Sequence, residues 1–394
     1  MSAVVAAAPR RIAVDKLGVF IAGLAVIAAC LPLVAFRANR IVPGEGLSLL
    51  AALPGWQAAL LALTLAAGIG LALLRTPVPV RLAASLVVLA ALWLAAGAAA
   101  SHLTPADDKL ARVSPGSGFW LLLLAFALLA ADGIARLRLG PWPRIAVLLA
   151  VASALALLLA SGLWRDLSIL REYSTRAESF WREAATHVVL AFGSLAAATL
   201  AGIPIGIACH RKRALRTAVL NVLNAVQTIP SIALFGLLIA PLAWVAANVP
   251  GAALLGISGI GAAPAMVALV AYSLLPVVAN TVVGLAGVPA ATDEAARGMG
   301  MTDWQRLTAV QLPLAFPVIL AGIRIVLVQN IGLATIAALI GGGGFGVFVF
   351  QGIGQTAMDL VLLGAAPTVA LAFAAAVVLD AIIELSAIRE PGRD

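Results

Sequence analysis

The segment from Asp293 to Pro317, DEAARGMGMTDWQRLTAVQLPLAFP, gathers charged and polar side chains in a chain that has few of them. It lies between two apolar runs, each long enough to cross a bilayer. A phosphate-binding loop would need the pattern G-x-x-x-x-G-K-[ST], and Lys16, Lys109 and Lys212 all lack it. We therefore expect the chain to have no cofactor, and any use of ATP would fall to a separate partner. On local physics alone, the segment fits an ordinary interfacial amphipathic loop as well as it fits a functional surface element.

Other residue types give little support for catalysis or metal binding. His102, His187 and His210 lie far apart in the sequence, and Cys30 and Cys209 form neither a disulfide nor a zinc pattern. We expect no metal site, and no combination of a nucleophile with a base indicates an enzyme.

Local rules predict two short helices joined by a glycine in the charged segment. Pro289 suits the start of a helix, and the residues from Ala290 to Met299 favour helix. Gly300 can end that helix in the left-handed conformation. Thr302 to Gln305 fits the capping-box pattern S/T-x-x-E/Q, so a second helix should begin there.

Composition places these helices in a membrane protein. The chain is 63% hydrophobic and 11% charged, with a mean hydropathy of +1.10, whereas soluble domains are typically about 25% charged. Because the apolar runs are long and uninterrupted, we predict an all-α, polytopic membrane helix bundle with about ten transmembrane helices. The predicted spans are Leu17–Phe36, Gly55–Leu74, Val80–Ala100, Gly118–Leu137, Pro143–Leu163, Thr186–Cys209, Ala218–Ala240, Pro264–Val288, Leu314–Ala338 and Ala365–Ala387.

The distribution of charge predicts the orientation. With the N-terminus inside, the inner segments hold 17 of the 25 Lys and Arg residues, among them Arg10, Arg11, Arg389 and Arg393. The outer segments hold eight acidic and eight basic residues, so the net charge of +8 lies on the inner face. The positive-inside rule then places both termini and the charged segment in the cytoplasm. This explanation of the basic charge leaves no reason to expect nucleic acid as a partner.

The chain divides into three regions by composition. Residues 1–163 form about five spans joined by short loops, and we interpret them as an accessory membrane region. Residues 164–183 alternate acidic and basic side chains, as expected for a periplasmic connecting helix with i,i+4 pairs. Residues 184–394 have more polar, glycine and proline residues within their spans, so we expect the function to lie there.

The charged segment resembles a known motif. It reads E-A-A-x3-G-x9-V-x-L-P, which is similar to the cytoplasmic coupling motif E-A-A-x3-G-x9-I-x-L-P in the permease subunits of ABC importers, with Val310 in place of isoleucine. In that family the segment docks into a groove of the ATPase subunit. The resemblance implies a type I permease core in residues 184–394 and a coupling loop at residues 289–313. It assigns coupling to Glu294, Ala295, Ala296, Gly300, Leu312 and Pro313.

Two further stretches indicate a branch of that family. NAVQTIPSIALFG (residues 224–236) and TIAALIGGGGFGVFVFQGI (residues 335–353) resemble permeases for glycine betaine, carnitine and choline. The five additional spans are similar in layout to the enlarged Yeh-type osmoprotectant permeases. The resemblance implies cytoplasmic ATPase subunits, a periplasmic substrate-binding protein and a second permease copy or related permease as partners in the bacterial inner membrane.

Polar residues inside the predicted spans suggest a translocation path. Residues at steps of three and four form a polar stripe beside Pro230, which should kink its helix. Such groups usually face a cavity or the bundle interior, and the alternative is hydrogen bonding between helices. The candidate path residues are Asn224, Gln227, Thr228, Pro230, Ser231, Asn280, Gln329 and Asn330.

Glycines mark the outer end of the ninth span. Gly341, Gly342, Gly343, Gly344 and Gly346 are unfavourable for a continuing helix. We predict a re-entrant or interfacial element from Gly341 to Gln355 as part of an outer gate, and a flexible loop is the alternative.

Together these features predict the permease subunit of an ATP-driven, binding-protein-dependent importer for osmoprotectants such as glycine betaine, carnitine or choline. Two alternatives stay open: an ABC permease for methionine or another amino acid, and a secondary carrier driven by an ion gradient. The second half has no carboxylate at mid-span, where proton-coupled carriers usually have one.

Overall fold

The computed structural model describes residues 15–39, 42–105, 108 and 110–386. Both chain ends lie outside the described residues. Arg10, Arg11, Arg389 and Arg393, whose charges help to predict the orientation, therefore lie outside them too, as do Arg40 and Lys109. The chain separates into two compact units. The first comprises residues 1–139 and 151–171, and the second comprises residues 140–150 and 172–394.

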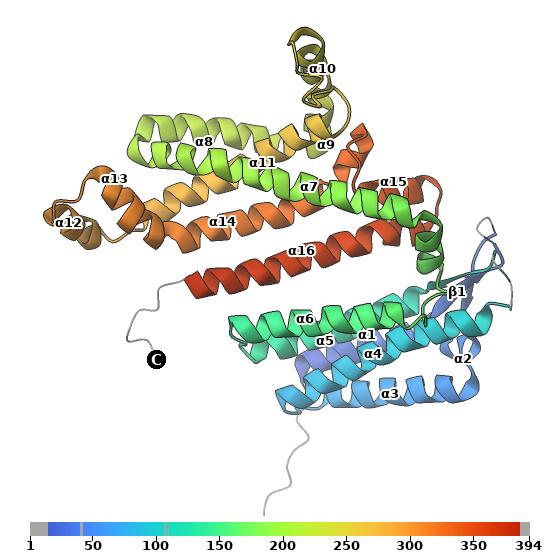
Figure 1. The fold of residues 1–394 in the computed structure, drawn as a ribbon. Coiled ribbons are helices and arrows are strands. Elements are labelled where there is room, and N and C mark those ends of the chain that lie inside the picture. The colour runs from blue at the N-terminus through green and yellow to red at the C-terminus, as the bar shows by residue number, and fades with distance from the viewer. Residues whose placement is uncertain (1–14, 40–41, 106–107, 109, 387–394) are drawn as a thin grey trace, which may run out of the picture. The chain divides into compact units, whose positions relative to one another are not determined.

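The first unit is a small helix bundle with an apolar centre (Figure 1). Its helices are α1 (Lys16–Ala29), α2 (Leu49–Ala52), α3 (Gly55–Leu73), α4 (Val78–Leu103) and α5 (Ser117–Arg136), together with the second part of α6 (Pro141–Ala160). Ile21, Leu92, Phe119 and Phe126 are fully buried between these helices. The Trp164 indole donates a hydrogen bond to the Trp93 carbonyl at 3.0 Å, which ties the end of the unit to α4.

A three-stranded antiparallel sheet, which the sequence did not predict, adjoins this bundle. Its strand order is β2 (Glu45–Leu47), β1 (Val34–Arg37) and β3 (Arg112–Pro115). The first span was expected to continue to Phe36, but α1 ends at Ala29 and Phe36 lies in β1. Pro32 explains the difference, because proline lacks the amide hydrogen that a continuing helix needs and disfavours helix in the preceding residue.

The second unit contains the two longest helices and the charged segment (Figure 1). Its helices are the first part of α6, α7 (Ser168–Arg211) from Glu172 onward, α8 (Arg213–Thr228), α9 (Ser231–Leu237), α10 (Ile239–Asn248), α11 (Ala262–Ala286), α12 (Ala290–Gly298), α13 (Asp303–Arg306), α14 (Leu312–Leu333), α15 (Gly346–Gly354) and α16 (Met358–Ser386). A π-turn, Leu307–Gln311, leads into α14, and a 3-10 turn, Ile336–Ile340, follows it. The helix α7 bends at Arg176, inside the segment predicted to connect the two regions.

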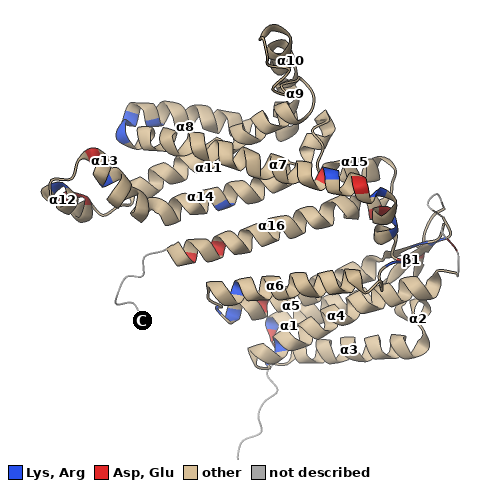
Figure 2. Ribbon diagram, viewed as in Figure 1, with Lys and Arg blue, Asp and Glu red and all other residues tan. Residues whose placement is uncertain are grey.

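Within the described residues, nine helical segments are long and apolar enough to cross a membrane, and α1 is a shorter apolar helix. This agrees with the expected count of about ten. Charged side chains gather near helix ends and in connecting segments (Figure 2). Arg324 of α14 lies within a span, and its guanidinium is 3.0 Å from the Asp380 carboxylate of α16.

The predicted seventh span, Ala218–Ala240, is not a single helix. The chain leaves helical conformation at Ile229 and Pro230, so α8 ends at Thr228 and α9 begins at Ser231. Pro230 therefore separates two helices instead of kinking one. The segment long enough to span is Ser231–Asn248, formed by α9 and α10.

Asp15 joins helix α1 to helix α4 within the first unit. Its carboxylate accepts a hydrogen bond from the Gly18 amide at 2.9 Å as the N-cap of α1. It also pairs with the buried guanidinium of Arg81 on α4 at 3.1 Å.

We expect Asp15→Asn to lower the thermal stability of the purified protein, because Arg81 loses its charged partner. Asp15→Ala should cost about 1 kcal/mol more, because the helix cap is lost as well. Thermal unfolding in detergent measures both changes. Asp132→Asn, which removes the exposed pair with Arg136, is the control with little expected effect. If both Asp15 variants unfold at the wild-type temperature, Asp15 does not stabilise the contact between α1 and α4.

Candidate functional site

The charged segment folds as the local rules predict. Pro289 precedes α12, Gly300 has φ +82°, and the capping box between Thr302 and Gln305 is present in both directions. The Thr302 amide donates to the Gln305 side chain at 2.8 Å, and the Gln305 amide donates to the Thr302 hydroxyl at 3.3 Å. Figure 1 shows α12 and α13 at the ends of α11 and α14, clear of the bundle. The segment is thus a bent, two-helix element presented outward.

An acidic residue that the sequence analysis did not single out holds this element together. The Arg306 guanidinium makes two hydrogen bonds to the Asp293 carboxylate, both at 3.1 Å. Gln311 donates its side-chain amide to the same carboxylate at 2.8 Å. The hydrogen bond from Gln311, reinforced by Arg306, lowers the pKa of Asp293 below its ordinary value. This Asp293 clamp fixes α12 against the turn that begins α14.

The residues assigned to coupling divide into exposed and inward-facing groups. Glu294, Ala295 and Gly300 are exposed, whereas Ala296 is 2% exposed. Leu312 is half-buried, and its amide donates to the Leu307 carbonyl across the π-turn. Pro313 is exposed in the first turn of α14.

Two large apolar side chains add to the outward surface. Met299 is 77% exposed and Trp304 is 68% exposed. Within the described residues, Glu294 forms no hydrogen bond or ion pair, so its carboxylate is open to a partner. The combination of an unpaired acid with exposed apolar side chains is what a docking surface needs.

Asn330, assigned to the path, lies instead inside the helix core. Its amide nitrogen is 2.8 Å from the hydroxyl oxygens of Ser194 on α7 and Ser273 on α11. All three side chains are fully buried. In this conformation Asn330 joins three helices, which is the alternative that the sequence analysis left open.

The remaining path residues are distributed over four helices of the second unit, α8, α9, α11 and α14. Asn224, Thr228 and Pro230 are exposed at α8 and its end, and Ser231 is half-buried at the start of α9. Gln227 donates to the Tyr272 carbonyl of α11 at 2.8 Å.

Asn280 and Gln329 are half-buried. The Asn280 amide bonds to the Pro276 carbonyl, and a side chain at Gly322 would lie 2.7 Å from the Asn280 Cβ. Asn280 therefore marks a close crossing of α11 and α14. Of the candidate path residues, the α8 group forms the exposed polar surface, and its role in transport stays a prediction.

The glycine-rich stretch is packed into the second unit. Gly341, Gly343 and Gly344 have φ between +76° and +85°, which favours glycine. The Gly344 amide donates to the Glu183 carboxylate of α7 at 2.8 Å. A Cβ on Gly346 would lie 1.8 Å from the Thr335 carbonyl oxygen, and Gly342 directly contacts the 3-10 turn.

Aromatic side chains lie beneath this stretch. The His187 ring is fully buried, with its centroid 4.9 Å from that of Phe345. Phe180 of α7 contacts both Phe345 and Phe348. These contacts hold the glycine-rich stretch against α7, and whether it acts as a gate stays a prediction.

Within the residues that the structure describes, no cluster of three or more His, Cys, Asp or Glu side chains is arranged to hold a metal ion. The arrangement instead places an exposed surface with Glu294, Met299 and Trp304 at one end of α14 and a packed glycine-rich turn at its other end.

Comparisons with known proteins identify the family. Residues 198–389 match the binding-protein-dependent transport system inner membrane component, and residues 15–170 match the N-terminal domain of the ABC transporter permease YehY. The osmoprotectant import permease protein OsmW of Salmonella typhimurium is 43% identical over 179 residues, which cover 45% of this chain and 78% of OsmW. This chain belongs to the ABC importer permease family.

Other relatives agree with this assignment. The glycine betaine/carnitine/choline permease protein OpuCB of Bacillus subtilis is 35% identical over 200 residues, covering 51% of this chain and 83% of OpuCB. A chain of the MetNI methionine ABC transporter, in an inward-facing conformation, has 23% identity and a TM-score of 0.48, covering 54% of this chain and 99% of that chain. Because both of these values are low, neither the substrate nor the conformation of that transporter is transferred to this permease.

The Asp293 clamp gives a direct prediction. Asp293→Asn should speed hydrogen exchange of the α12 amides, because the charged partner of Arg306 and Gln311 is lost. Asp303→Asn is the matched control, since Asp303 also pairs with Arg306 but its side chain is 84% exposed.

Acid should have the same effect as Asp293→Asn. Because the pKa of Asp293 is lowered in the folded protein, the clamp contributes fully above the ordinary value of 3.8 and is lost as the pH falls through the lower, folded value. Exchange rates are compared after correction for intrinsic pH dependence. Equal protection of α12 in the wild type and in Asp293→Asn would contradict the clamp.

Proposed function

We propose that this permease forms the membrane pathway of an ATP-driven importer for osmoprotectants of the glycine betaine, carnitine and choline class. The proposal rests on the bent element at residues 289–313, whose exposed surface suits a docked partner. The names of the relatives supply the substrate class. ATP hydrolysis is assigned to separate cytoplasmic ATPase subunits, and substrate delivery to a periplasmic binding protein.

The proposed mechanism uses α14 as the connection between the two faces of the membrane. This helix has 22 residues, which corresponds to about 33 Å and matches a hydrocarbon layer of about 30 Å. The bent element precedes its first turn, and the glycine-rich stretch follows its last. Movement of docked ATPases would shift the bent element as a unit, because the Asp293 clamp keeps α12 fixed to the start of α14.

The orientation follows from the same proposal. The bent element lies in the cytoplasm, and the stretch from Gly341 to Gln355 lies toward the periplasm as part of an outer gate. Both chain termini are then cytoplasmic, as the distribution of basic residues predicts.

The pathway is proposed to form between two permease subunits, which are two copies of this chain or this chain and a related one. The exposed polar residues Asn224 and Thr228, with Gln227 and Ser231 beside them, would line it from α8 and α9. Uncharged amides and hydroxyls suit a zwitterion or a quaternary ammonium, because they solvate either charge without trapping it.

Uptake into vesicles tests the substrate class. The permease is reconstituted with its ATPase and binding protein, and uptake of labelled glycine betaine is measured. We expect uptake that needs ATP and is reduced by carnitine or choline but not by methionine. Competition by methionine alone would indicate an amino-acid importer, and uptake without ATPase subunits would indicate a secondary carrier.

Gly300 tests the coupling role. Gly300 has φ +82° with open space around it, so an alanine there meets backbone strain and no clash. A non-glycine residue in the left-handed conformation costs about 1–2 kcal/mol. Each 1.4 kcal/mol of free energy changes an equilibrium constant about tenfold. We therefore expect Gly300→Ala to lower ATP-dependent uptake by roughly tenfold while insertion stays normal.

Gly298 supplies the matched control for this test. It also has open space around it but lies in α12 with negative φ, and Gly298→Ala should leave uptake near the wild-type rate. If Gly300→Ala transports as well as Gly298→Ala, the bend does not couple ATP hydrolysis to transport.

A further inference from the structure

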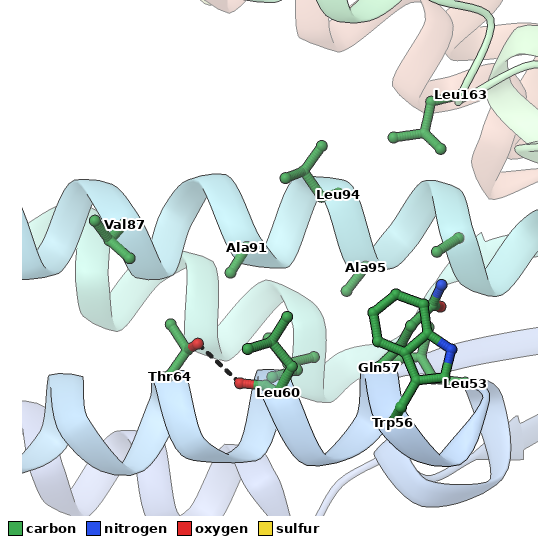
Figure 3. A pocket seen from close by; sticks show the side chains of 12 residues that line it. Leu53, Trp56, Gln57, Leu60, Thr64, Val87, Ala91, Leu94, Ala95 and Leu163 are labelled. Carbon is green, nitrogen blue, oxygen red and sulfur yellow. Dashed lines mark hydrogen bonds between the residues drawn. The ribbon is translucent and has the colours of Figure 1, made fainter.

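A lengthwise groove in the first unit is unrelated to the coupling segment. A cavity of about 320 Å³ lies between α3 and α4 (Figure 3). Trp56, Gln57 and Thr64 line it from α3, and Ala91 and Ala95 line it from α4. Its volume falls in the range of about 300–1,000 Å³ that small-molecule sites occupy.

The groove continues toward the other end of the two helices. A second cavity of about 450 Å³ shares Thr64 and Val87 with the first and extends to Val80. Small residues shape this part: Gly68 and Ala84 line it, and a Cβ on Gly68 would lie 2.6 Å from the Val88 side chain. The two cavities therefore lie next to each other along the same pair of helices, and their linings are largely apolar.

The surroundings of this groove indicate its occupant. Both α3 and α4 are candidate membrane spans, and the groove rims are exposed and apolar: Leu60 is 58%, Val87 is 59% and Leu94 is 52% exposed. The 19 residues of α3 extend over about 28 Å, close to the thickness of the hydrocarbon layer. In a bilayer the molecules that reach such a groove are lipids, and a tail that fills it gains the van der Waals contacts that an empty groove lacks.

One end of the groove is polar. Trp56, at the start of α3, is 70% exposed, as expected for a residue at a membrane interface. Beside it, the Gln57 side-chain oxygen is buried and accepts no hydrogen bond within the described residues. A buried amide oxygen of this kind requires a donor. The Gln57 side chain lines the groove, so a small rotation of its amide brings this oxygen to the groove surface. An occupant that combines an apolar chain with a donor at its interfacial end then meets both requirements.

We propose that the α3–α4 groove binds a phospholipid, with an acyl chain along the groove and a head group that donates a hydrogen bond to Gln57. Ethanolamine and glycerol head groups carry such donors, whereas choline does not. The site therefore discriminates between head groups through Gln57 and accommodates the tail through the alanines and glycine of the groove.

Photolabelling tests the position of the tail. The full chain is reconstituted in phosphatidylethanolamine and phosphatidylglycerol vesicles that contain a trace of phosphatidylethanolamine with a photoactivatable acyl chain. Labelled positions are then mapped by mass spectrometry. We expect labels to concentrate on the groove-facing positions of α3 and α4. Labelling spread evenly around both helices in the wild type would overturn the proposal, whatever the variants show.

Matched alanine substitutions sharpen this test. Ala91→Phe fills the groove, whereas Ala90→Phe and Ala62→Phe add the same ring at exposed positions of α4 and α3 outside its lining. The measured quantity is the ratio of labels at groove-facing positions to labels at other exposed positions of α3 and α4. This ratio should fall to near unity in Ala91→Phe and stay at the wild-type value in both controls. A wild-type ratio in correctly inserted Ala91→Phe would refute the assignment of the tail.

Head-group selection is tested by mass spectrometry of the intact protein after detergent extraction. We expect the wild type to retain phosphatidylethanolamine in preference to phosphatidylcholine of the same chain length. Gln57→Leu should lose this preference but keep the tail labelling. Equal retention of the two lipids by the wild type would show that Gln57 does not select between the head groups.

Discussion

The amide of Asn330 is the contact on which the helix arrangement of the second unit depends. Hydrocarbon offers no hydrogen-bond partner, so a buried amide must be satisfied by other side chains of the protein. Asn330 on α14 meets this requirement with Ser194 on α7 and Ser273 on α11. The three hydroxyl and amide groups come from helices that are far apart in the sequence, and each helix must keep its rotation and depth for the contact to form. Asparagine within a span suggested a path for solute. Asn330 instead holds together three of the helices around which such a path can be built.

Close packing extends this frame toward the bent element. Gly206 of α7 contacts Thr281 of α11, Gly322 of α14 contacts Asn280, and Gly284 of α11 contacts Ala315. Small residues let helix backbones approach where no hydrophobic force acts between them in lipid. At the end of α14 the Asp293 clamp replaces apolar packing with charge-assisted hydrogen bonds, which suits a segment outside the hydrocarbon. A rigid core and a rigid surface element are therefore joined through one continuous helix.

Local signals predicted the bent element well because each acts over a few residues. The capping box joins Thr302 to Gln305, and the left-handed conformation belongs to Gly300 alone. Asp293 carried no such signal, since its partners Arg306 and Gln311 come close only when α12 folds back. Hydropathy also misplaced the seventh span, because an average over apolar residues from Ala218 to Ala240 does not register the helix break at Pro230. The small sheet escaped prediction for the related reason that β1 pairs with β3, which is distant in the chain.

The sequence by itself determined the membrane class, the approximate number of spans, the bent two-helix motif and the permease family. The membrane class and the spans follow from composition, because the bilayer requires long apolar helices. The motif and the family follow from short patterns of residue types along the chain. Only the tertiary structure decided that Asn330 is enclosed while Asn224 is exposed, that Glu183 holds Gly344, and that α3 and α4 leave a groove between them. Polar residues in apolar helices look alike in a sequence. Whether each one meets a partner, a cavity or lipid depends on how the helices are rotated against one another, and packing sets that rotation.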